Sequence, residues 1–109
     1  MQAGFWIRTV RDNIVDMLSP LEIILFSVKR NQAGEEKSFK LCVVADSCDK
    51  LEAEKRIYLG IDSDVPFDVL LYTPQEWDEL LRQPDSFAKR ISQEGTYIYG
   101  SEPKPHKKQ

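Results

Sequence analysis

Hydrophobic side chains in the first part of the chain recur at intervals of three and four residues, which is the spacing of one helix face. Charged side chains such as Arg8, Arg11 and Asp12 fill the positions between them. Pro20 follows closely, and the residue before a proline is disfavoured in a helix. The pattern therefore predicts an amphipathic helix over residues 5–18. Its apolar positions are Trp6 or Ile7, Val10, Ile14, Met17 and Leu18.

Three continuous apolar runs of strand length lie further along the chain. Residues 22–26, 38–45 and 67–72 are rich in branched and aromatic side chains, as strands in a covered sheet are. Polar residues from 29 to 37, with Gly34 among them, predict a loop or hairpin connection between the first two runs. The spacing therefore predicts three strands.

A short and highly charged helix is expected between the second and third strands. Asp46 and Ser47 carry side-chain oxygens that suit the N-cap of a helix over residues 48–59. Turn-forming residues between Gly60 and Pro66 then separate this helix from the third strand.

The third strand is followed by a helix start signal. Thr73 can cap the helix, Pro74 suits its first position, and Glu76 can reach back as the capping-box partner. We expect this helix to run to about residue 82.

A second helix follows, capped by Asp85 or Ser86 and closed by Gly95. Its expected inward side chains are Phe87, Ala88 and Ile91. Residues 96–99 are predicted to be extended and to pack on the sheet edge or the helices. The tail, residues 101–109, has no apolar side chain and is expected to be disordered.

This order of elements predicts one α/β (α+β) domain over residues 1–100, with a small mixed β-sheet and helices mainly on one face. The 109 residues suffice for one such domain and are too few for two.

Composition narrows the functional classes. The chain is 41% hydrophobic and 30% charged, with a formal net charge of −3, so no strong nucleic-acid binding is expected. No apolar stretch is long enough to cross a bilayer, and no signal peptide is evident, which predicts a cytoplasmic protein without membrane contact. Cys42 and Cys48 match neither a redox pair nor a zinc motif and are expected to be reduced thiols.

The series of segments from Phe67 onward resembles the minimal nucleotidyltransferase domain of the DNA polymerase β superfamily. The resemblance covers residues 7–100 and is strongest in the last third. It rests on Phe67-Asp68-Val69-Leu70-Leu71, Thr73-Pro74-x-Glu76-Trp77, Gln83-Pro84-Asp85-Ser86-Phe87, Gln93-Glu94-Gly95 and Ile98-Tyr99-Gly100. It implies a nucleotidyltransferase-like fold, which in active members transfers a nucleotidyl group with two metal ions.

The chain departs from the family pattern where those metal ions are bound. Active members have a strand ending in Leu-Phe-Gly-Ser, a short basic loop, then Ser-Asp-x-Asp opening the next strand, and later a third acid. Here Ser27-Val28 replaces the Gly-Ser pair, and the two acids of the Asp-x-Asp motif fall on Ser38 and Lys40. Of the three acids only Asp68 remains.

Lys40 has donors and no acceptor, so it cannot ligate a metal, and it adds a positive charge where divalent cations would bind. The resemblance therefore implies a degenerate active site in which Ser38, Lys40 and Asp68 are vestigial, with no metal and no cofactor. The alternative is an active or weakly active enzyme that transfers NMP from an NTP to a protein or small-molecule acceptor and requires Mg²⁺.

Two binding roles follow from the same residues. Ser27, Lys29, Arg30 and Lys40 could hold nucleotide phosphates without metal, the lysine standing where magnesium stands in active members. The resemblance also implies a protein partner, because minimal nucleotidyltransferases commonly act in two-component, toxin–antitoxin-like pairs. Such a partner would be a helical HEPN-type or substrate-binding protein, or a second copy in a homodimer.

Overall fold

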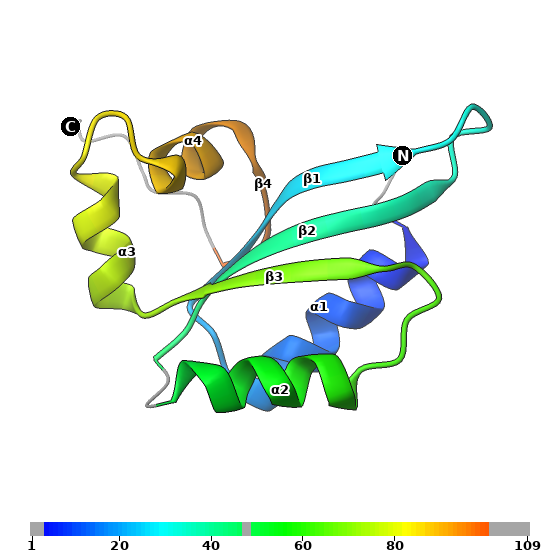
Figure 1. The fold of residues 1–109 in the computed structure, drawn as a ribbon, viewed down its shortest axis with the longest axis horizontal. Coiled ribbons are helices and arrows are strands. Elements are labelled where there is room, and N and C mark those ends of the chain that lie inside the picture. Colours follow the sequence, from blue (N-terminus) through cyan, green and yellow to red (C-terminus); the bar gives the residue numbers. More distant parts are fainter. Residues whose placement is uncertain (1–3, 47–48, 101–109) are drawn as a thin grey trace.

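The computed structural model describes residues 4–46 and 49–100 and contains a four-stranded mixed sheet with four helices in those ranges (Figure 1). The elements are α1 (Phe5–Leu18), β1 (Glu22–Arg30), β2 (Glu36–Val44), α2 (Lys50–Gly60), β3 (Phe67–Tyr72), α3 (Pro74–Leu81), α4 (Phe87–Glu94) and β4 (Thr96–Tyr99). The strand order is β3-β2-β1-β4. β1 is antiparallel to β2 and β4, and β2 is parallel to β3. The predicted α+β class with a small mixed sheet is confirmed.

Helix α1 has the predicted bounds and buries Ile7, Val10 and Ile14. It ends at Ser19, which adopts a left-handed conformation with φ of 46° and whose N–H donates to the carbonyl of Val15. This cap and the following proline turn the chain into β1.

The two faces of the sheet are covered differently. On the first face, α1 and α2 pack over side chains such as Ile23, Leu41 and Val69. On the second face, α3 and α4 pack over Ile24 and Cys42. Figure 1 shows α3 and α4 gathered at one end of the sheet, with α1 and α2 running beneath it. Helices therefore pack on both faces and not mainly on one as predicted, and the second face is covered at one end only.

The first strand is longer than predicted. β1 continues to Arg30, and of the two predicted connections, loop or hairpin, the structure has the hairpin, because the β1–β2 ladder extends through Lys29 and its partner Ser38. The turn is closed by Asn31, whose Oδ1 accepts from the backbone N–H groups of Ala33 and Glu35. Alternating polar residues in a two-stranded ribbon do not form the continuous apolar run by which the other strands are recognised.

The N-cap of α2 also differs from the prediction. Asp49 accepts from the N–H of Glu52, so the helix begins at Lys50, and Asp46 lies before it. Ser47, the other expected cap, lies outside the described residues, as does the tail from residue 101. The predicted helix start was too early because Asp46 and Ser47 have capping side chains of the same kind as Asp49.

Helices α3 and α4 confirm their predicted start signals. The side-chain hydroxyl of Thr73 accepts from the backbone N–H of Glu76, and the carboxylate of Glu76 accepts from the backbone N–H of Thr73. The hydroxyl of Ser86 caps α4. The prediction for Phe87 is wrong, because its side chain is 52% exposed while Ala88 and Ile91 are buried. Phe87 lies about 100° from Ala88 but only about 40° from Ile91 around the helix, so it is at the edge of the buried stripe, where its ring stays partly in solvent.

Strand β4 pairs with β1 at the sheet edge. Of the two packings predicted for residues 96–99, on the sheet edge or on the helices, the first is confirmed. No helix in the described part of the chain is long and apolar enough to cross a membrane.

Candidate functional site

Three of the expected site residues form one row across the sheet. The β1–β2 register pairs Ser27 with Lys40, and the β2–β3 register pairs Lys40 with Asp68. Phe39 and Val69, the strand neighbours of Lys40 and Asp68, point into the core of the first face. Side chains alternate along a strand, so Lys40 and Asp68 lie on the second face, beyond the end that α3 and α4 cover. We call Ser27, Lys40 and Asp68 the polar row.

The polar row lies beside a second pair from the same list. Lys29 and Ser38 are opposite each other, two residues nearer the hairpin turn and therefore on the same face. Ser38, Lys40 and Asp68 line a cavity of about 70 Å³, together with Phe39, Pro66 and Phe67. The structure therefore brings Ser38, Lys40 and Asp68 to one place.

Arg30 does not join this group. Its guanidinium donates to Glu36 at 3.1 Å, and the same carboxylate accepts from the backbone N–H of Gly4 at 3.2 Å. Glu36 therefore links the N-terminal end of α1 to the hairpin, and the charge of Arg30 is already paired with it. Within the described ranges, Lys29 and Lys40 have no carboxylate within 4.0 Å.

The polar row does not fit a magnesium site. It offers one carboxylate, one hydroxyl and one ammonium group, whereas Mg²⁺ is bound through carboxylates, phosphates and water. Among residues 4–46 and 49–100, no cluster of three His, Cys, Asp or Glu side chains could hold a metal ion. The donor set is thus suited to an anion next to Lys40 and unsuited to a divalent cation.

A larger pocket of about 320 Å³ opens beside the polar row. It is lined by Phe26, Lys40, Tyr58, Asp68, Val69, Leu70 and Phe87. Tyr58 reaches it from α2 around the edge strand β3, where its hydroxyl accepts from the N–H of Val69 at 2.7 Å. Burial raises the pKa of Tyr58, and the nearby carboxylate of Asp68 adds to the shift. Tyr58 therefore stays neutral and closes the outer rim.

Two phenyl rings, those of Phe26 and Phe87, separate this pocket from a second one. Phe26 occupies a bulge in β1, and its ring meets that of Phe87 edge to face, with centroids 5.7 Å apart. We call Phe26 and Phe87 the aromatic ridge. Phe87 is 52% exposed and lines the pocket, so part of its ring is accessible to a planar ligand.

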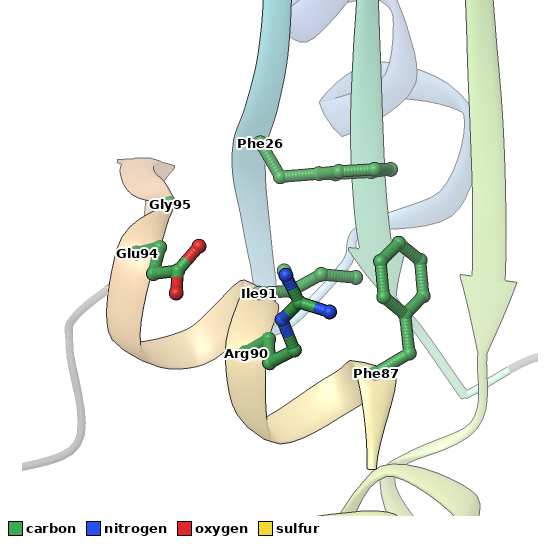
Figure 2. A pocket seen from close by; sticks show the side chains of 6 residues that line it. All are labelled: Phe26, Phe87, Arg90, Ile91, Glu94 and Gly95. Carbon is green, nitrogen blue, oxygen red and sulfur yellow. The ribbon is translucent and has the colours of Figure 1, made fainter. Parts of the chain in front are cut away.

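The neighbouring pocket has a volume of about 190 Å³ and lies on the other side of the aromatic ridge. Figure 2 shows Arg90 and Phe87 reaching from α4 toward Phe26, with Glu94 and Gly95 farther along the chain. Arg90 is exposed and makes no ion pair within the described ranges. Unpaired cations, Lys40 and Arg90, therefore line the pockets on the two sides of the ridge.

The sequence-based prediction of the site missed Phe26, Phe87 and Arg90. Phe26 follows the same alternation as Ile24 and so lies on the second face, but the sequence does not show that the helices leave this part of the face open. Phe87 and Arg90 are three residues apart, which places them on one side of α4. That spacing, counted against the buried pair Ala88 and Ile91, is the one signal that could have found them.

Cys42 lies behind the site and takes no part in it. Its side chain is fully buried on β2, and burial, followed by the nearby Glu22 carboxylate, raises the pKa of its thiol to about 12. A thiol with this pKa stays protonated at neutral pH and is a poor nucleophile.

Comparison of the chain with protein-family models, with curated proteins and with solved structures found no match.

Proposed function

We propose that this chain is a nucleotidyltransferase-like domain without transferase activity, which binds a nucleotide on the second sheet face through its phosphates and without a metal ion. The observation that carries the proposal is the place of Lys40 between Ser27 and Asp68 in the strand register. In active enzymes of this kind the corresponding position supplies a carboxylate to the metal. An ammonium group there offsets phosphate charge directly.

The surroundings of Lys40 suit the two ends of a nucleotide. Lys29 and Ser38, one step along the hairpin, offer a second cation and a hydroxyl for phosphate oxygens. The aromatic ridge borders the adjoining pocket and offers an apolar ring face to a base. A volume of about 320 Å³ lies at the lower end of the range of small-molecule sites.

The test is a thermal shift titration with ATP, GTP, CTP and UTP in excess EDTA. A ligand at about ten times its dissociation constant stabilises the folded state by roughly 1.4 kcal/mol, which raises the Tm of a domain this size by several degrees. We expect this shift in the wild-type protein and its loss in Lys40→Met. Arg11→Met, which removes a cation from α1 on the other face, should keep it.

No shift with any nucleotide at millimolar concentration would refute the proposal. Equal shifts in the wild-type protein and in Lys40→Met would move the site away from the polar row.

The runner-up is an active enzyme with a rearranged site, because Asp68 keeps its place in the polar row. Incubation with labelled NTPs, Mg²⁺ or Mn²⁺ and candidate acceptors distinguishes the two functions. We expect no transfer above background. Robust transfer that is abolished by Asp68→Ala would establish the runner-up in place of the proposal.

A further inference from the structure

Helix α2 carries large apolar side chains on its outward side as well as its inward side. It buries only Ala53 and Ile57, while Leu51 is 71% and Leu59 83% exposed. Exposed apolar side chains gathered on one element mark interaction surfaces more often than isolated ones do. At 100° per residue, positions 51, 55 and 59 form one row that faces away from the buried pair. We call Leu51, Lys55 and Leu59 the α2 ridge.

A groove lies beside the α2 ridge, on the side where α1 ends. It has a volume of about 460 Å³ and is lined by Met17, Glu52, Lys55, Arg56, Leu59 and Gly60. The groove exists partly because residue 60 has no side chain, since a Cβ there would lie 2.9 Å from Cε of Met17. The groove is wide enough to receive an apolar side chain from another helix.

The charged residues around the α2 ridge make no ion pairs within the described part of the protomer. Glu52, Lys55 and Arg56 have no ion-pair partner within 4.0 Å in the described part of the chain. Glu52 and Arg56 are four residues apart, on the same flank of the ridge. The surface thus presents both signs of charge beside its leucines.

We propose that the α2 ridge is a self-complementary interface at which a second copy of this chain packs its own α2 in the antiparallel direction. A two-fold axis beside Lys55 sets Leu51 next to Leu59 of the second copy, at both ends of the contact. Ridges spaced by four residues pack in this way at a crossing angle of about 50°.

The charges favour this occupant. A two-fold axis brings the same flank of the two helices together, so Glu52 of each copy lies opposite Arg56 of the other. The Lys55 stems lie over the leucines, and their amines reach the second copy's Glu52. Antiparallel helices also place opposite dipole ends side by side. An interface based on one helix per copy is small, so the dimer is expected to be weak.

Sedimentation equilibrium over a range of protein concentrations tests the proposal. We expect a reversible monomer–dimer equilibrium in the wild-type protein and at least a tenfold weaker one in Leu59→Glu. Leu21→Glu is the matched control, because Leu21 is also exposed, at 59%, but lies outside α2. Circular dichroism checks that the variants fold. We expect them to fold because the side chain of residue 59 is at the surface. A strict monomer at about millimolar concentration, where weak complexes form, would overturn the proposal.

Cysteine cross-linking tests the direction of the helices. In a Cys48→Ser background, a mixture of Leu51→Cys and Leu59→Cys proteins should form a mixed disulfide. Leu51→Cys alone should not cross-link to itself, because antiparallel packing separates the two copies of residue 51 by about 12 Å along the helix, beyond disulfide reach. Self-cross-linking of Leu51→Cys in preference to the mixed product would contradict the arrangement. This surface is on the first face, so these results are independent of nucleotide binding on the second face.

Discussion

Replacing Lys40 with aspartate tests the electrostatics of the polar row. Lys40 and Asp68 are direct neighbours on parallel strands. Neighbouring strands are about 4.8 Å apart, and two unit charges at about 5 Å interact by roughly 1 kcal/mol in water. Both side chains are exposed, which places the pair in the range of roughly 0.2–1 kcal/mol measured for cross-strand charge pairs.

Lys40→Asp replaces this attraction with a repulsion of similar size. We therefore expect the free energy of unfolding to fall by about 1 kcal/mol, which lowers the Tm of a domain this size by roughly 4–8 °C. Lys40→Met removes the attraction without adding repulsion, so its loss should be about half as large. Urea unfolding at low and high salt measures both. Salt screens exposed charges, so the difference between the two variants should shrink at high salt.

Added Mg²⁺ gives a second readout of the same geometry. Two carboxylates on one sheet face can share a divalent cation, whereas one cannot hold it well. Mg²⁺ should therefore raise the Tm of Lys40→Asp and leave that of Lys40→Met unchanged. If Lys40→Asp is as stable as Lys40→Met at low salt, and Mg²⁺ affects neither, then residues 40 and 68 do not face each other.

Four further predictions concern the framework around the site. Thr73→Ala should lower the free energy of unfolding by about 1 kcal/mol in urea, because the N–H of Glu76 loses its capping acceptor; an unchanged stability would contradict the capping box. Glu76 has a lowered pKa, chiefly because it accepts from the Thr73 N–H, so it stabilises the fold above its unfolded pKa and this contribution is lost as pH falls through the folded pKa. Glu76→Gln should therefore flatten the acid limb of a stability–pH profile, and an identical limb would refute the assignment. Gly95→Ala should cost about 2 kcal/mol, because its Cβ would lie 2.5 Å from Cγ2 of Ile24 and 2.7 Å from the carbonyl oxygen of Ile91; a neutral result in the same urea assay would show that α4 can shift. In a Cys48→Ser background, Cys42 should react with a thiol reagent only after unfolding, and rapid reaction of the folded protein would contradict its burial.

Local signals predicted most of the fold. Thr73, Pro74 and Glu76 lie next to one another in sequence, so their capping box can be recognised without knowledge of the rest of the chain. The same holds for the bounds of α1 and for the apolar run of β3. These features depend on a few neighbouring residues, which is why a single sequence is enough to find them.

Features that depend on distant residues were not predictable in this way. The hydrogen bonds that Glu36 accepts from Arg30 and from the N–H of Gly4 require the hairpin to lie beside the start of α1. The bulge at Phe26 can be recognised only from the register of β1 against β2. Phe87 then meets Phe26 because α4 packs over the far end of the sheet. The polar row could be predicted from motif positions, but the aromatic ridge beside it could not.

The pocket and the polar row give Lys40 a more specific role than its sequence position does. In the sequence, Lys40 is notable only because the family resemblance implies a metal-binding acid at that position. In the structure it lies in one row with Ser27 and Asp68 and lines a pocket with Phe26 and Phe87. A residue that only removed a function would not need these neighbours, whereas a residue that binds an anion is served by them.

Titration of ATP into ¹⁵N-labelled protein in excess EDTA, followed by amide chemical shifts, is the most direct test of metal-free binding on the second sheet face. The account predicts saturable shifts at Ser27, Lys40 and Asp68 and at the aromatic ridge, with residues of α1 unaffected. No saturable shift at millimolar ATP, or shifts confined to the first face, would contradict it.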